Sequence, residues 1–210
     1  VKDADGRRPE EYDFAGACFV AEVPSTADIG RRAAERALSR LGSKKGASAA
    51  MTLVLDNRAA GRLIGALVQP LTGAALQQKR SFLEGKTGQP IGSPLFDVAD
   101  DPLIPRAFGS RLWDGEGLAA KRMPVFEKGV LRNYYLDTYY AKKLGLAPTT
   151  GGPSNASWTL GTKPQAEILK DVGEGLLVTG FIGGNSNGTT GDYSFGIQGF
   201  RIRGGQRAEP

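Results

Sequence analysis

The sequence predicts an α+β fold with a predominantly antiparallel, strongly curved or barrel-like sheet and a few helices packed on it. Three observations support this prediction. Thirty glycines and twelve prolines divide the 210 residues into short elements, as in folds with many strands and turns. Residues 26–41 have helical periodicity, and residues 193–203 alternate like a strand. The chain is 40% hydrophobic and long enough to bury the core of one large domain or two small ones.

The first element is predicted to be a strand within residues 12–22. Its larger side chains fall on one parity, which is typical of a strand with one buried face. Cys18 then belongs to the core, because a reactive thiolate would need a nearby base and none is available. The residues that share this parity are Tyr12, Phe14, Cys18 and Val20.

A helix is predicted over residues 26–41. Ser25 or Thr26 can cap its free amides, Asp28 lies in the first turn, and Gly42 follows as a C-cap. One face is apolar, and the arginines fall largely elsewhere, which favours an exposed charged face. The apolar positions are Ile29, Ala33, Ala37, Leu38 and Leu41.

The next predicted elements are a strand at 51–55, a helix capped by Asp56 or Asn57 and interrupted at Pro70, and a helix at 74–83. The apolar face of the capped helix is typical of a core or interface helix. It consists of Leu63, Ile64, Leu67 and Val68.

Residues 85–117 are rich in proline and glycine and contain an acidic cluster. Paired carboxylates can act as general acid and base, but beside prolines we interpret them as solvated turn residues. A β-hairpin is predicted over residues 122–136, with Gly129 at its turn. The acidic cluster consists of Asp97, Asp100 and Asp101.

The C-terminal third is predicted to contain a helix at 137–144 closed by Gly145, a helix at 164–172, and a strand at 175–182. A glycine-rich loop, residues 183–192, leads into the strand at 193–203, for which we expect a bulge near Gly199 and a turn at Gly204 and Gly205.

Nucleotide binding by the glycine-rich loop is the weaker alternative. Gly183 and Gly188 have the spacing of a P-loop. Thr189 stands where the lysine is required, and a strand follows where a helix is needed.

The chain has no histidine and one cysteine. A zinc site usually needs three or four imidazole or thiolate ligands, whereas carboxylates alone favour calcium or magnesium. Serine hydrolases usually need an imidazole base. A serine–lysine hydrolase stays open because serine and lysine are neighbours at Ser43-Lys44 and within Lys79–Ser81.

The net charge is +5, spread along the chain, so a mildly basic solvated surface is preferred over a nucleic-acid footprint. With no leader and no long apolar run, we expect a cytoplasmic location and no membrane partner.

Several motifs in a fixed order resemble the TldD/PmbA family, in particular its PmbA/TldE branch. They are Ala33–Leu38, Tyr135–Gly145, Gly175–Thr179, Asn187–Ser194 (Asn-Gly-Thr-Thr-Gly-Asp-Tyr-Ser) and Gly199–Ile202. Known family members are longer at both ends. Residues 1–210 are therefore expected to form a central-to-C-terminal PmbA/TldE-like domain, without the family's N-terminal domain and last strands.

The resemblance implies a role in peptide processing. TldD-type subunits are zinc peptidases with an H-E-x-x-x-H helix, and they act with a TldE-type partner on peptides such as a microcin precursor and on an unfolded antitoxin. Aligning Leu71-Thr-Gly73 with the segment after that motif places Ile64 and Gln69 at the histidine positions and Gly65 at the glutamate position. The motif's chemical groups are missing at all three positions.

We therefore expect no catalytic, metal or cofactor residue in this chain, with zinc on a TldD-like protease subunit as partner. The chain would help to enclose a peptide or unfolded protein, which could add to a sheet edge by β-augmentation. Asn187, Thr189 and Asp192 are the candidate substrate or partner contacts; the alternative is that the loop serves only turn geometry. A homodimer in isolation is also expected. The family's older name, modulator of DNA gyrase, keeps a DNA- or gyrase-associated binding module as the rival function.

Overall fold

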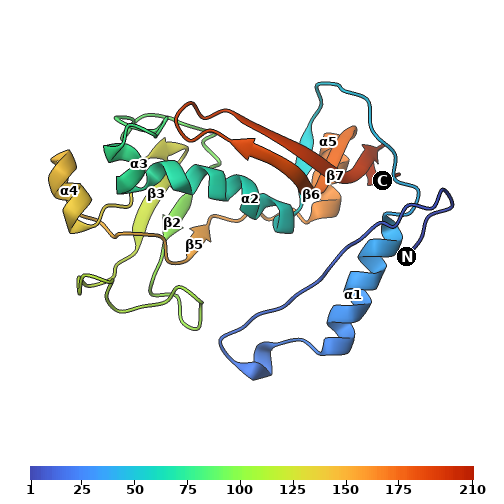
Figure 1. Cartoon of the computed structure of the whole chain (residues 1–210), viewed down its shortest axis with the longest axis horizontal. Coiled ribbons are helices and arrows are strands. Elements are labelled where there is room, and N and C mark those ends of the chain that lie inside the picture. The colour runs from blue at the N-terminus through green and yellow to red at the C-terminus, as the bar shows by residue number, and fades with distance from the viewer. The chain divides into compact units, whose positions relative to one another are not determined.

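A computed structural model describes all 210 residues, and it has the predicted α+β architecture (Figure 1). The strands form two four-stranded sheets. The chain divides into two compact units. The first unit comprises residues 1–61, 162–184 and 195–210, and the second comprises residues 62–161 and 185–194. None of the helices combines the length and apolar character needed to cross a bilayer.

The first unit contains the sheet β1-β6-β7-β8. β1 is parallel to β6, β7 is antiparallel to β8, and β6 and β7 form one long curved ribbon (Figure 1). The unit's core is small and consists of Leu169, Leu177, Phe200 and Ile202. The elements are β1 (Leu53–Leu55), α5 (Gln165–Val172), β6 (Gly175–Ser186), β7 (Tyr193–Arg203) and β8 (Gln206–Arg207).

The second unit contains the sheet β4-β3-β2-β5, in which every pair is antiparallel. Its core is larger and includes Leu71, Leu83, Phe126 and Leu131. The elements are the 3₁₀ helix η2 (Gln69–Leu71), α3 (Gly73–Gln77), β2 (Val98–Asp100), β3 (Met123–Glu127), β4 (Val130–Leu131), α4 (Thr138–Leu144) and β5 (Ala156–Trp158).

Local sequence signals explain several of these elements. Lys128 and Gly129 both have positive φ, 49° and 75°, as the two-residue turn of a tight hairpin requires. Asp137 caps α4 by accepting a hydrogen bond from the Tyr140 amide at 2.7 Å, and Gly145 ends this helix at φ 67°.

The predicted N-terminal helix is confirmed as α1 (Thr26–Ser39), capped by the Ser25 hydroxyl, which accepts from the Asp28 amide at 3.1 Å. The strand predicted before it is wrong. Tyr12 and Phe14 are exposed, at 68% and 76%, Cys18 is exposed, and the only regular element there is the 3₁₀ helix η1 (Val20–Glu22).

Ion pairs, not a buried apolar face, attach this segment to α1. Asp13 pairs with Arg32 and Arg36, and Arg40 contacts Glu11 at 3.2 Å. Arg32 and Arg36 of α1 and Arg40 at its C-cap are therefore partly buried anchors. Arg31 alone keeps the exposed, charged position that the sequence favours.

Three boundaries also differ from the prediction. The helix predicted at 74–83 ends at Gln77, because the chain turns through Lys79 at φ 56°. The second hairpin strand stops at Leu131, and the buried residues Tyr134 to Leu136 lie outside it. β6 continues to Ser186, which shortens the glycine-rich loop to residues 187–192.

Candidate functional site

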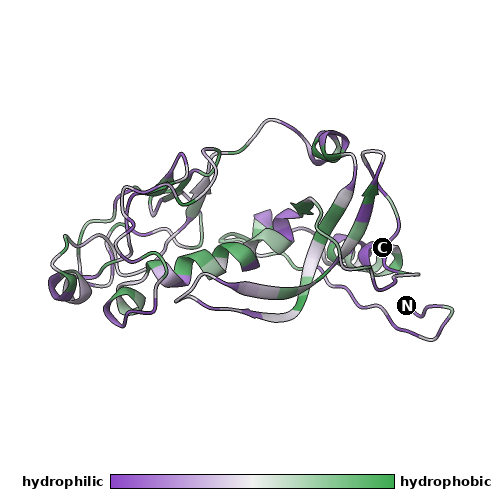
Figure 2. Cartoon of the chain, turned by 90° about the horizontal axis from the view of Figure 1, so that it is seen from above, coloured by the Kyte–Doolittle hydropathy of each residue, from purple (hydrophilic) through white to green (hydrophobic).

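The helix with the three predicted motif positions is α2 (Asn57–Val68). Asp56 caps it by accepting a hydrogen bond from the Arg58 amide at 3.0 Å, and Pro70 converts its end into η2. The helix is coloured mostly hydrophobic in Figure 2, yet Ala59 is its only buried residue. Much of its apolar surface is thus only partly covered within this chain.

The three motif positions lie on the second half of α2 and just beyond it. Ile64 is half-buried, whereas Gly65 and Gln69 are exposed. A side chain at Gly65 would meet no atom within 4 Å. The position that aligns with the glutamate therefore faces open space.

The loop with the candidate contacts is a tight turn at the tip of the β6–β7 hairpin. The Asn187 amide donates to the Asp192 carbonyl at 2.7 Å, and the Asn187 side chain accepts from the Thr189 amide at 2.9 Å. Asn187, Thr189 and Asp192 are all exposed. The Asn187 side chain thus shapes the turn, while no such bond engages the side chains of Thr189 and Asp192.

The structure brings this loop against the end of the motif segment, within the second unit. The Phe82 amide donates to the Gly188 carbonyl at 2.8 Å. A Cβ on Gly188 would lie 2.8 Å from Gln69 Oε1, and one on Gly191 would lie 3.2 Å from the Phe82 ring. Gln69 and the loop thus form one surface, which we call the Gln69–loop surface; Ile64 and Gly65 lie further back along α2.

The donor chemistry of this surface does not fit zinc. The three motif positions offer a hydrocarbon side chain, no side chain, and a neutral amide, none of which is a usual zinc ligand. Elsewhere in the structure no three Cys, Asp or Glu side chains converge in a way that could hold a metal ion.

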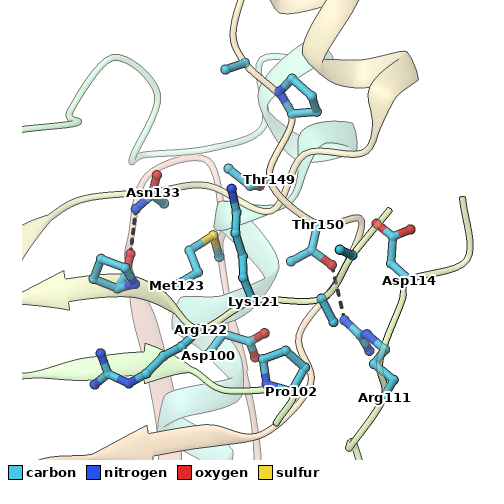
Figure 3. A pocket seen from close by; sticks show the side chains of 15 residues that line it. Asp100, Pro102, Arg111, Asp114, Lys121, Arg122, Met123, Asn133, Thr149 and Thr150 are labelled. Carbon is cyan, nitrogen blue, oxygen red and sulfur yellow. Dashed lines mark hydrogen bonds between the residues drawn. The ribbon is translucent and has the colours of Figure 1, made fainter. Parts of the chain in front are cut away.

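A cavity of about 450 Å³ lies in the second unit, where the sequence predicts no site. Asp100 and Met123 line it from the sheet, Lys121 points toward Thr149, and Arg111 reaches Thr150 (Figure 3). It therefore combines the buried Asp100 carboxylate and a second carboxylate, Asp114, with three cationic side chains.

The interpretation of Asp100 as a solvated turn residue is wrong. It lies in β2 and is 1% exposed. Its carboxylate accepts hydrogen bonds from the Ser154 amide at 2.6 Å and from the Ser154 hydroxyl at 2.7 Å. Burial raises the pKa of the Tyr135 phenol far above its usual range, and the nearby charge of Asp100 raises it further.

Its acidic neighbours do serve turns. The Asp97 side chain accepts from the Lys128 amide at 2.9 Å, and that of Asp101 accepts from the Leu103 amide at 3.0 Å. A signal for Asp100 existed in the sequence, because it directly follows two apolar residues, Val98 and Ala99, that a strand could bury.

Arg111 connects two loops beside this cavity. Its guanidinium donates to the Thr150 hydroxyl at 3.2 Å and to the Gly152 carbonyl at 3.0 Å. Its Nε–H has no acceptor and is closed off from solvent. A ligand in the cavity therefore cannot reach that group without a rearrangement.

The serines of the hydrolase alternative are bound to backbone groups. The buried Ser81 hydroxyl donates to the Pro70 carbonyl at 2.6 Å and accepts from the Leu83 amide at 3.1 Å. The Ser43 hydroxyl donates to the Arg40 carbonyl at 2.5 Å. These bonds give both serines structural roles, and they hold neither hydroxyl against a lysine base.

Comparison with known proteins identifies relatives over most of the chain. The pattern of the PmbA/TldA metallopeptidase C-terminal domain matches residues 48–210. Metalloprotease PmbA of Escherichia coli O157:H7 is 27% identical over 212 residues, covering 100% of this chain and 47% of that protein. The chain thus spans about half the length of its curated relatives.

Solved structures have the same fold. A Bacteroides thetaiotaomicron protein named for a modulator of DNA gyrase superposes with a TM-score of 0.89 at 41% identity, covering 92% of this chain and 44% of that one. TldE from Thermococcus kodakarensis superposes with a TM-score of 0.75 at 23% identity, over 87% of this chain and 45% of that one. The second likeness concerns the fold alone.

Proposed function

Because this chain belongs to the PmbA/TldD family of metallopeptidases, we propose that it is the family's non-catalytic, PmbA/TldE-like subunit. In this proposal it pairs with a zinc-bearing TldD-like peptidase. Together the two subunits enclose a chamber in which peptides or unfolded proteins are cut. The compartment we propose is the cytoplasm.

The observation that carries the proposal is the chemistry of α2. A catalytic zinc needs protein ligands that leave one coordination position open for the attacking water. Ile64, Gly65 and Gln69 supply no such ligands. The metal and the activated water are therefore assigned to the partner.

The Gln69–loop surface and the partly covered face of α2 support a role in the chamber wall. Beyond Val178, where the pairing with β1 ends, β6 continues to Ser186 at the hairpin tip without a third strand on its outer side. An extended peptide could add to this edge through main-chain hydrogen bonds, largely independently of its sequence. Thr189 and Asp192, at the hairpin tip, belong to the second unit and are proposed as separate contacts for the substrate.

Co-expression of the full-length protein with the TldD-like protein of the same genome tests the pairing. We expect the two to co-purify with zinc on the partner alone, and the isolated protein to form a homodimer in place of the heterodimer. The measurement is a pull-down followed by a metal count on each separated subunit. Stoichiometric, tightly bound zinc on the isolated protein would refute the proposal.

Peptide processing by the reconstituted pair tests the loop. We expect Thr189→Ala combined with Asp192→Ala to slow processing while leaving the pull-down unchanged. Thr190→Ala is the matched control, since the Thr190 hydroxyl accepts only from the Asp192 amide, at 3.3 Å. If the double variant and Thr190→Ala process the peptide at the same rate, the loop has only a structural role.

A further inference from the structure

A second cavity, in the first unit, is lined by four arginines. It measures about 300 Å³. The arginines that line it are Arg36 of α1, Arg40 at the C-cap of α1, Arg58 of α2 and Arg207 of β8. We propose that this arginine pocket binds the phosphate group of a small organic molecule. Neither the peptidase proposal nor the family's zinc chemistry involves these residues.

Two of the arginines are held in place by buried carboxylates. Arg36 pairs with Asp13, and Arg40 contacts Glu11 at 3.2 Å. The side chains of Asp13 and Glu11 are only 8% and 7% exposed. These pairs orient the guanidinium groups and lower the entropy lost on binding a ligand.

The other two arginines are less neutralised. Arg58 lies 3.5 Å from Asp56, a long contact for an ion pair. The Arg207 guanidinium lies over the Phe200 ring, 4.1 Å from the centroid, and has no carboxylate partner. These two arginines therefore have the greatest capacity to bind an incoming anion.

Two helices begin at the pocket. Asn57 and Gln165, the first residues of α2 and α5, both line it. α5 begins after Pro164 without a side-chain cap, so no side chain accepts from its first amides, although the Glu167 amide donates to the Pro164 carbonyl at 3.0 Å. A helix N-terminus attracts negative charge, and here this effect adds to that of the arginines.

Charge and size select the ligand class. The four lining arginines face two lining carboxylates, Glu11 and Asp56, which leaves a net charge of +2. This charge matches a phosphate dianion better than a carboxylate, and guanidinium groups bind phosphate in bidentate geometry. A cavity of about 300 Å³ is at the lower limit of small-molecule pockets, so it suits a phosphate with a small organic part.

The pocket also extends beyond the matched family domain, although the curated relatives align with the preceding segment as well. The family match begins at residue 48, whereas Arg36 of α1 and Arg40 at its C-cap precede it. The site thus depends on the attachment of α1 to the first unit, and it is distinct from the Gln69–loop surface.

Calorimetric titration of the full-length protein with inorganic phosphate tests the proposal, with acetate as the carboxylate probe. We expect saturable phosphate binding, weaker acetate binding, and at least about tenfold lower phosphate affinity in Arg58→Gln and in Arg207→Gln, because each loses a charged hydrogen bond. Arg203→Gln is the matched control, since Arg203 pairs with exposed Glu209 outside the pocket.

Arg207→Lys is the second variant, because removing the contact with Phe200 could disturb folding. It keeps the positive charge and should retain intermediate affinity. Circular dichroism verifies that each variant is folded. Absence of phosphate binding, stronger acetate binding, or unchanged affinity in folded Arg58→Gln and Arg207→Gln variants would overturn the proposal. None of these outcomes bears on partner pairing.

Discussion

At the residue scale, the glycines separate into two kinds that the sequence cannot distinguish. A Cβ at Gly199 would lie 1.9 Å from the Leu177 carbonyl oxygen, so the neighbouring strand excludes any side chain there. A Cβ at Gly65 would meet nothing within 4 Å. The first glycine is required by packing, and the second only weakens a helix.

We therefore predict opposite effects for two identical substitutions. Gly199→Ala should destabilise the protein by about 3 kcal/mol or more, because rigid backbone must move. Gly65→Ala should stabilise it by about 0.5–1 kcal/mol through helix propensity. Thermal or denaturant unfolding measures both, and a tolerated Gly199→Ala would show that the two strands are further apart than described.

Asp100 gives a second prediction at this scale. Asp100→Ala leaves both Ser154 donors without their acceptor in a buried site and should cost about 3 kcal/mol. Asp101→Ala is the control, because it removes one turn hydrogen bond and a long 3.8 Å ion pair with Arg122 at a more exposed position and should cost under about 1 kcal/mol. Similar unfolding midpoints for the two variants would contradict the buried role of Asp100.

At the element scale, α1 is attached largely by charge. Hydrogen bonds from Arg32 and then Arg36 hold the pKa of the Asp13 carboxyl below its usual value of 3.8. A carboxyl with a lowered folded-state pKa binds its proton more readily in the unfolded state. The stabilisation is therefore present above about pH 4 and is lost as pH falls through the lowered pKa.

We predict that α1 loosens from the N-terminal segment on acidification below about pH 4. Hydrogen exchange of α1 amides across pH 3–6 should show this loss of protection in the natural protein, after correction for the intrinsic exchange rate. Asp13→Asn should exchange faster at neutral pH and show a weaker pH dependence. The variant retains Asp28, whose pKa is also lowered, mainly by the hydrogen bond from Ser25. The difference in exchange between the variant and the natural protein therefore reports on Asp13 alone. An identical pH dependence in the two proteins would contradict the role of Asp13.

At the scale of the whole molecule, ion pairs neutralise part of the positive charge. Arg31 pairs with Glu35, Arg132 with Glu127, and Arg203 with Glu209. Arg32 and Arg36 pair with Asp13, and Arg40 pairs with Glu11. The net charge of +5 comes from 27 basic against 22 acidic residues spread along the chain, which is a weak basis for releasing counterions from DNA. This distribution argues against the DNA-binding alternative.

We predict no saturable binding of a short DNA duplex at micromolar protein, even at low salt. Fluorescence anisotropy across a salt series measures it. Tight binding that weakens steeply with added salt would favour the DNA-associated function.

Local signals in the sequence predicted much of the fold. Helix caps and tight turns depend on neighbouring residues, so the sequence predicts the helices and the hairpin that they delimit. The examples are the caps at Ser25, Asp56 and Asp137 and the turn at Lys128-Gly129. The strand predicted from hydrophobic periodicity in residues 12–22 is wrong, because periodicity indicates that one face is apolar but not that another part of the protein covers it.

The sequence alone determined two properties: the lack of a histidine and the order of motifs that identifies the family. Composition and order exist before folding, so no conformation can change them. Only the tertiary structure placed Gln69 beside Gly188, buried Asp100 and gathered four arginines around one cavity. These residues are far apart in the chain, and they meet only because the packing of strands and helices fixes which surfaces face each other.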